Sequence, residues 1–324
     1  MDQVRLGVIG AGMQGISHLR QFARHPLVEL RAICDINDEL LKSSAEIFGI
    51  PLQYTDYGEL VAGDEVDAVV IVLPDHLHRD AAVRALEAGK HVFAEYPLAR
   101  RLQEGEHLME LAQTAGRVLR LSHGESLSGL YRQLKQEVDE LGPLLTGLFA
   151  RLTPGRGARP EVRFNLEISG PPSLFFVYQV YPLVYLFGAA AWVEAHARYV
   201  DLREDGGYQR FANVVTVGFV EGGLHQWTWA GGIEIDAAEQ VQRLVLQRGS
   251  LVRQDGHWCR STAAAVEVIQ PAEGAEISLE EMFLQDIKGG ESGWRDDLQR
   301  AFEAMKIGLA AERSVREERR ISLF

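Results

Sequence analysis

A glycine-rich turn near the start of the chain has the residue types and the spacing that bind a dinucleotide. Residues Gly10-Ala11-Gly12-Met13-Gln14-Gly15 follow an apolar run predicted to be a strand and open a predicted helix. In such a turn the first glycine permits the tight bend, the second lets the backbone approach a pyrophosphate, and the third allows the helix to pack on the sheet. The amino end of the helix then offers free N–H groups to phosphates. We expect cofactor contacts from Gly10, Gly12, Met13, Gln14 and Gly15.

An acidic residue, Asp35, ends the second predicted strand twenty residues after Gly15. A carboxylate at this place accepts hydrogen bonds from the adenosine ribose hydroxyls and repels a 2′-phosphate. The nearest cationic side chain after it is Lys42. The sequence therefore favours NAD(H) as the cofactor and leaves NADP(H) open.

The third predicted strand leads into a polar loop, Leu73-Pro74-Asp75-His76-Leu77-His78. Ligands of open α/β sheets bind at the carboxyl ends of parallel strands, so this loop should face the cofactor. Two of its histidines could be metal ligands, but no further His or Cys lies at a supporting spacing. We expect Leu73, Pro74 and His78 to contact the cofactor, and no metal site.

His123 and Glu125 follow the last predicted strand of this region, at another strand end. Two interpretations of them stay open. They form an acid–base pair that faces the cleft, or they are polar residues at an exposed domain junction. His123 is therefore a candidate catalytic residue.

The elements that must position these residues alternate along the first third of the chain. Strand, helix and strand in succession are typical of a doubly wound α/β domain, with buried parallel strands. We predict an NAD(P)-binding Rossmann domain over residues 1–122. Its predicted strands are Val4–Ile9, Val28–Cys34, Ala68–Leu73, His91–Ala94 and Val118–Leu121, and its predicted helices are Ile16–Arg24, Asp38–Phe48, Arg79–Glu87 and Glu104–Thr114.

After about residue 122 strands dominate. We predict an α+β domain over residues 123–324 for substrate binding and oligomerisation, with an open, mostly antiparallel sheet. A final helix, roughly residues 294–313, is expected to pack back towards the first domain. The sheet is predicted to contain an antiparallel meander of Val193–Asp201, Ala212–Val220, Gly223–Ala230 and Gln240–Gln247.

Composition excludes several classes of protein. The 324 residues carry 33 Lys and Arg against 46 Asp and Glu, a net charge of −13, and this acidity argues against nucleic-acid or anionic-membrane partners. The two cysteines, Cys34 and Cys259, have no paired spacing and fit a reducing cytoplasm, and the amino terminus shows no secretory pattern. The uncharged stretch Leu174–Val193 is interpreted as a buried helix, a turn and a strand, with a membrane span as the minor alternative.

A further strand end completes a resemblance to a known family. Residues 88–99 read AGKHVFAEYPLA. Together with GAGMQG, the PDHLH loop and the later sheet region with its closing helix, they resemble the glucose-fructose oxidoreductase/inositol dehydrogenase family (Gfo/Idh/MocA) over essentially the whole chain. The resemblance implies an NAD(P)-dependent oxidoreductase that transfers hydride to or from a small organic substrate, with Glu95 and Tyr96 at the cofactor.

Two departures from the family pattern bear on the chemistry. Family dehydrogenases usually have Glu-Lys-Pro, whose lysine assists proton transfer at a sugar hydroxyl, where this chain has Glu95-Tyr96-Pro97. Their Asp–Gly–His–Asp pattern matches a stretch in which Tyr181 replaces the histidine base. Oxidation of a polyol needs a base with a pKa near the working pH, and tyrosine ionises only at about pH 10. The candidate catalytic residues are thus Tyr96, Tyr181, His123 and Glu95.

Glu-Tyr-Pro resembles the biliverdin reductase branch of the family, which implies a reductive reaction on a conjugated substrate. An aromatic stretch would suit a flat ligand, and arginines in the preceding segment could meet its propionates, although core packing explains most of the aromatics equally well. Two alternatives stay open: a sugar or cyclitol dehydrogenase or keto-sugar reductase with atypical acid–base residues, and a catalytically silent NAD(H)-binding sensor. The residues in question are Phe175, Phe176, Tyr178 and Tyr181, and Arg151, Arg156, Arg159 and Arg163.

His225, Trp227 and Trp229 share one face of a predicted strand. The resemblance implies that this sheet builds a subunit interface, in a homodimer or homotetramer. Packing is therefore the better interpretation of these three side chains than catalysis.

Overall fold

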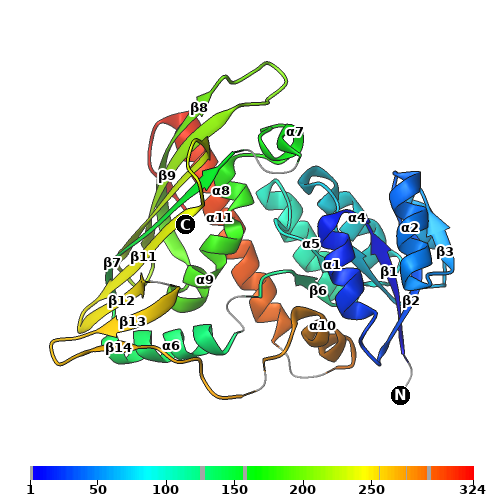
Figure 1. Ribbon diagram of the computed structural model, residues 1–324, viewed down its shortest axis with the longest axis horizontal. Coiled ribbons are helices and arrows are strands. Elements are labelled where there is room, and N and C mark those ends of the chain that lie inside the picture. The colour runs from blue at the N-terminus through cyan, green and yellow to red at the C-terminus, as the bar shows by residue number, and fades with distance from the viewer. Residues whose placement is uncertain (1–2, 125–127, 156–158, 255, 275, 290–292) are drawn as a thin grey trace. The chain divides into compact units, whose positions relative to one another are not determined.

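The chain folds into two compact units, each built on its own sheet. The computed structural model describes residues 3–124, 128–155, 159–254, 256–274, 276–289 and 293–324. The first unit comprises Met1–His123 and Ile277–Phe302, and the second comprises Gly124–Glu276 and Glu303–Phe324. Figure 1 shows the elements of both units and labels those for which there is room.

The first unit contains a six-stranded, wholly parallel sheet in the order β3-β2-β1-β4-β5-β6. This is the predicted doubly wound arrangement. Every residue of the central strand β4 is buried, as expected for a strand covered on both faces. The strands are β1 (Val4–Ile9), β2 (Val28–Cys34), β3 (Leu52–Tyr54), β4 (Ala68–Ile71), β5 (His91–Ala94) and β6 (Leu119–Leu121).

Helices alternate with these strands, and local capping sets some of their ends. The Asn37 side chain accepts hydrogen bonds from two backbone N–H groups at the start of α2, and Gly49 ends that helix in the left-handed conformation. Residues 75–78, predicted as loop, form the first turn of α4 instead, which begins directly after Pro74. The helices are α1 (Met13–Phe22), α2 (Asp38–Phe48), α3 (Tyr57–Ala62), α4 (Asp75–Glu87) and α5 (Leu102–Thr114).

A late segment of the chain completes the first unit. It contains α10 (Leu279–Ile287) and the start of α11 (Trp294–Glu317). The buried guanidinium of Arg120, on β6, donates from Nε to Asp286 at 2.6 Å and from Nη1 to Asp297 at 3.0 Å. Two carboxylates of the late segment therefore neutralise one buried cation of the sheet.

The second unit contains a nine-stranded, mostly antiparallel sheet in the order β14-β13-β12-β11-β7-β10-β9-β8-β15. The predicted meander is correct for β8, β9 and β10 but wrong for β11, which pairs with β7 rather than β10. The cause is β7, a strand with no counterpart in the prediction, which lies parallel to β10 between the two. The strands are β7 (Leu144–Pro154), β8 (Ala190–Val200), β9 (Arg210–Phe219), β10 (Leu224–Ile233), β11 (Glu239–Leu246), β12 (Gly249–Gln254), β13 (His257–Ser261), β14 (Val266–Val268) and β15 (Ile321–Ser322).

One face of this sheet is covered within the unit. Trp227 and Trp229 donate from their indole N–H groups to the backbone and side-chain oxygens of Gln179, on α9 (Val177–Phe187), at 3.3 and 2.5 Å. These two tryptophans and His225 are fully buried. The three side chains therefore pack, as predicted, but inside their own unit rather than at the subunit interface that the resemblance implied. The unit also contains α6 (Gly129–Leu141), α7 (Pro160–Arg163) and α8 (Pro172–Phe175).

The uncharged stretch beginning at Leu174 forms the end of α8, then α9, a turn at Gly188 and the start of β8. This is the predicted succession of buried helix, turn and strand. Among the described helices, none combines the length and the apolar character needed to cross a membrane.

Candidate functional site

The turn between β1 and α1 has the backbone geometry that its glycines predict. Gly10 has a φ of +103°, and a Cβ there would lie 2.1 Å from the carbonyl oxygen of Val72. A Cβ on Gly15 would lie 1.9 Å from the carbonyl oxygen of Gly10. At Gly12, by contrast, a Cβ would meet no described atom within 4 Å. The turn is therefore closed against the sheet at two glycines and open for a ligand at the third, a cradle that suits a pyrophosphate.

Asp35 is fixed against this turn by two backbone groups. Its Oδ2 accepts a hydrogen bond from the N–H of Ala11 at 2.7 Å, and its Oδ1 accepts one from the N–H of Asn37 at 2.8 Å. A carboxylate has further lone pairs on both oxygens, and this side chain is only half-buried. Asp35 can thus accept ribose hydroxyls beside the glycine turn. Met13 and Gln14, at the start of α1, are both exposed.

His78 joins the two loops that follow β4 and β5. Its ring is buried, with Nε2 2.7 Å from the carbonyl oxygen of Leu73 and Nδ1 3.0 Å from that of Pro97. Its nitrogens thus hold loop backbone, while Leu73 and Pro74 remain half-buried. Within the described residues, no three His, Cys, Asp or Glu side chains form a group that could hold a metal ion.

Asp75, the first residue of α4, is a titratable group that we had not predicted for the site. Burial raises the pKa of its carboxyl to about 6, a shift that Glu95 increases and that the charges of His78 and Arg100 oppose. Asp75 can therefore hold or release a proton near neutral pH.

Glu95, which follows β5, is part of a chain of hydrogen bonds. One carboxylate oxygen lies 2.9 Å from Nε2 of His18, and the other accepts from the hydroxyl of Ser122 at 2.6 Å. Nδ1 of His18 lies 3.0 Å from a carboxylate oxygen of Glu280, on α10. The predicted residue Glu95 is thus held directly by His18 and Ser122, and through His18 by Glu280, three partners that the sequence did not reveal. No short motif connects these partners, because Glu280 lies 262 residues from His18.

The two carboxylates keep His18 positively charged. Burial alone would lower its pKa, but hydrogen bonds to Glu280 and Glu95 outweigh that effect and raise the pKa of His18 to about 9. The side chain of His18 is 11% exposed. A buried imidazolium therefore fixes the orientation of Glu95 immediately before Tyr96.

Tyr96 and His123 lie together, although they come from different strand ends. Their rings stack with centroids 5.1 Å apart and an interplanar angle of 16°. Tyr96 is half-buried, whereas His123 is 3% exposed, and burial lowers the pKa of His123 to about 3. His123 is therefore a neutral ring that supports Tyr96. Its proposed partner Glu125 lies outside the described residues.

The second unit presents the aromatic stretch on α8 and α9. Tyr181 is fully buried, and Phe175 and Tyr178 are half-buried. The guanidinium of Arg163 lies over the ring of Phe175, 5.5 Å from its centroid. Of the other arginines considered, Arg151 bonds to Gln240 along the sheet, Arg159 precedes α7, and Arg156 lies outside the described residues.

Comparison with known proteins agrees with this geometry. A sequence model described as "Oxidoreductase family, NAD-binding Rossmann fold" (GFO_IDH_MocA) matches residues 4–123. A glycosyl hydrolase family 109 protein from Shewanella pealeana is 31% identical over 177 residues, which are 52% of this chain. The chain covers only 38% of the length of that relative.

Solved structures resemble the chain over nearly its whole length. A biliverdin reductase from Synechocystis sp. PCC 6803, in complex with biliverdin and NADP⁺, matches with a TM-score of 0.85 and 22% identity over 96% of this chain and 98% of that one. The WlbA dehydrogenase from Bordetella pertussis, with NADH and UDP-GlcNAcA, matches at 0.83 and 20% over 99% of each chain. A levoglucosan dehydrogenase with NADH and levoglucosan matches at 0.82 and 19% over 99% and 100%. The chain shares the fold of these proteins, and its residues 4–123 match the sequence model of the Gfo/Idh/MocA oxidoreductase family.

Proposed function

We propose that this chain is an NAD(P)-dependent oxidoreductase that reduces a small, conjugated organic substrate. The observation that carries the proposal is the glycine turn, open at Gly12, with the Asp35 carboxylate bonded to its backbone. A bound nicotinamide would supply the hydride, and the chain's own residues would bind and orient the dinucleotide. Because Asp35 suits free ribose hydroxyls and repels a 2′-phosphate, NAD(H) is the preferred cofactor.

The groups at the ends of β5 and β6 favour reduction over oxidation of an alcohol. Oxidation needs a base that takes the hydroxyl proton near the working pH. Both carboxylate oxygens of Glu95 are hydrogen-bonded, one to His18 and one to Ser122. His123 is a poor base because its pKa is low. Hydride addition to an electron-poor carbon needs only a weak acid, which Tyr96, Asp75 or an ordered water can supply. Tyr96 is the better candidate than Tyr181, which is fully buried.

The most specific form of this proposal is that the substrate is a bilin. The half-buried ring of Phe175 offers a flat apolar surface, and the exposed guanidinium of Arg163 beside it offers a charge for a propionate. The biliverdin reductase with the same fold binds such a molecule together with NADP⁺.

The test is a titration of biliverdin with NADH and with NADPH, followed at the bilin absorption bands. We expect the bands to change with at least one cofactor. In Tyr96→Phe, which keeps the stacked ring and removes the hydroxyl, kcat should fall about 10- to 100-fold with little change in the KM for NADH. Tyr57→Phe, in α3, is the matched control and should keep the kcat. Unchanged spectra with both cofactors would exclude a bilin, and an unchanged kcat in Tyr96→Phe would exclude that proton donor.

A sugar or cyclitol is the second candidate substrate. The curated relative is named a glycosyl hydrolase, and the levoglucosan dehydrogenase of the same fold binds a sugar derivative. Oxidation of NADH with a panel of keto-sugars, in the absence of activity on bilins, would favour this candidate. Quenching of tryptophan fluorescence by NADH without turnover of any substrate would identify a silent sensor instead.

We also propose that the chain forms a homodimer, or a tetramer built from dimers, through the uncovered face of its second sheet. Leu148, Leu224 and Val241 lie on the adjacent strands β7, β10 and β11 and are 42–56% exposed. The opposite face, with His225 and the tryptophans, is covered by α9 and is not available. Leu148→Asp should convert the oligomer to a monomer in sedimentation experiments, and a monomeric wild-type protein would refute the proposal.

A further inference from the structure

A cavity of about 500 Å³ opens at the amino ends of the strands of the first sheet, whereas the glycine turn follows the carboxyl end of β1. Its cations are Arg5 of β1, Lys90 before β5 and Arg117 before β6. Its carboxylates, Asp64 and Asp67, precede β4. This local excess of positive charge stands in a protein with a net charge of −13.

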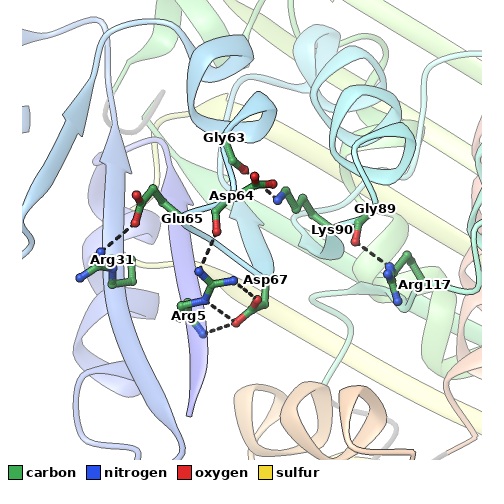
Figure 2. Close-up of polar contacts among 9 residues, drawn as sticks. All are labelled: Arg5, Arg31, Gly63, Asp64, Glu65, Asp67, Gly89, Lys90 and Arg117. Carbon is green, nitrogen blue, oxygen red and sulfur yellow. Dashed lines mark hydrogen bonds and ion pairs between the residues drawn. The ribbon is translucent and has the colours of Figure 1, made fainter. Parts of the chain in front are cut away.

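Arg5 and Asp67 neutralise one another. The guanidinium donates from Nε and Nη2 to the two oxygens of Asp67 at 3.1 and 2.6 Å, and from Nη1 to the carbonyl oxygen of Asp64 at 2.6 Å (Figure 2). This bidentate pair holds the wall of the cavity and leaves little capacity for a ligand.

Lys90 and Arg117 are held differently, by neutral carbonyl groups. Nζ of Lys90 donates to the carbonyl oxygen of Gly63 at 2.8 Å, and Nε of Arg117 donates to that of Gly89 at 2.6 Å (Figure 2). Lys90 is only 8% exposed. Among the described residues neither cation forms an ion pair with a carboxylate, so no carboxylate occupies either one, and each has N–H groups beyond the one already bonded.

His91 adds a neutral donor to the same cavity. Its Nδ1 accepts a hydrogen bond from the backbone N–H of Val118 at 3.1 Å. Burial, reinforced by the charge of Arg117, lowers the pKa of His91 to about 4. At neutral pH its single ring proton is therefore on Nε2, which can only donate.

We propose that this cavity at the amino ends of the strands binds a small oxyanion, a phosphate group or a carboxylate, through Lys90 and Arg117. Arginine presents two parallel N–H groups that match either oxyanion, and a buried ammonium adds a positive charge that solvent screens only weakly. Asp64, exposed at the rim, limits the site to small or strongly charged anions. The site is distinct from the cofactor turn, because the two lie at opposite ends of the strands of one parallel sheet.

Calorimetric titration of the full chain at low ionic strength, with inorganic phosphate and separately with citrate, tests the proposal. We expect saturable one-to-one binding of at least one of them. Lys90→Met and Arg117→Gln should each weaken it about tenfold or more, since each removes a charged hydrogen bond. The matched control is Lys42→Met, at an exposed ion pair with Asp38 on α2, which should bind as the wild type does.

Comparison of phosphate with citrate shows which kind of ligand the site prefers. Binding of phosphate alone assigns a phosphate group, and binding of citrate alone assigns a carboxylate. Absence of saturable binding of either, or equal binding by the wild type and both variants, would overturn the proposal. So would displacement of the anion by NADH, which would place it at the glycine turn. Because Lys90→Met could disturb folding, Arg117→Gln, whose side chain is half-buried, gives an independent result.

Discussion

Two buried histidines, one in each unit, show opposite responses to burial. His18, in the first unit, lies between the carboxylates of Glu95 and Glu280, and its pKa rises to about 9. His225, in the second unit, is fully buried beside Trp227, with ring centroids 4.3 Å apart, and its pKa falls to about 3. Within the described part of the chain, neither ring nitrogen of His225 has a hydrogen-bond partner.

The difference shows that burial alone does not set the charge of a side chain. Burial lowers the pKa of both rings, and the two acidic partners reverse this effect for His18. Charge is thus concentrated at the carboxyl end of β5, beside the proposed active site, while the buried aromatic face of the second sheet remains neutral. Three substitutions test this contrast.

The largest effect should come from Arg120, which extends the comparison to a buried cation that cannot lose its proton. Arg120→Met leaves the carboxylates of Asp286 and Asp297 buried without their shared partner. We expect a loss of about 3–5 kcal/mol in the free energy of unfolding, measured by urea denaturation. The exposed pair of Arg84 and Asp80 is the control, and Arg84→Gln should cost less than about 1 kcal/mol. Equal losses in the two variants would contradict the importance of burial.

His18 should stabilise the protein in acid and lose this contribution in alkali. Its pKa is higher in the folded state, about 9, than the ordinary 6.5, so its contribution is complete below pH 6.5 and disappears as the pH rises through 9. The difference is on the order of 3 kcal/mol. Urea midpoints of the wild type should therefore fall between pH 6.5 and 9 relative to His18→Gln. Parallel curves for the two proteins would show that His18 is neutral.

His225 should act in the opposite direction. Its folded pKa, about 3, lies below the ordinary 6.5, so the unfolded chain binds the proton first and stability is lost as the pH falls below 6.5. The loss from this group is about 2 kcal/mol at pH 5. His225→Phe should remove this acid sensitivity, so its melting temperature should fall less than that of the wild type between pH 7 and 5. A steeper fall in the variant would contradict the assignment.

The sequence was most informative where local signals set an element. The bounds of β1, β2, α2 and β5 agree with the prediction, because Asn37 and Gly49 mark the ends of α2 and short apolar runs mark the strands. β3, only three residues long, carries no such pattern and was missed. The position of β7 between β10 and β11 depends on pairing across the whole sheet, which no local pattern reveals.

The candidate site likewise combines features that depend on neighbouring residues in the sequence with features that depend on distant ones. The glycine turn and Asp35 can be predicted from the sequence because the chemistry expected of them depends on residues close in sequence, and their role in cofactor binding stays a prediction. Glu95 was identified from its motif, but the charge that orients it comes from His18 and Glu280, which are far apart in the chain. The pKa values of His123 and Asp75 depend on burial, which the sequence alone did not indicate.

The discontinuity of the first unit has a consequence for protein synthesis. Residues up to His123 leave the ribosome long before Ile277–Phe302, so β6 is made while both carboxylate partners of Arg120 are still untranslated. The nascent first sheet therefore cannot bury Arg120 as an ion pair until strands β7 to β14 of the second sheet have been synthesised. Completion of the first unit therefore depends on synthesis of nearly the whole chain.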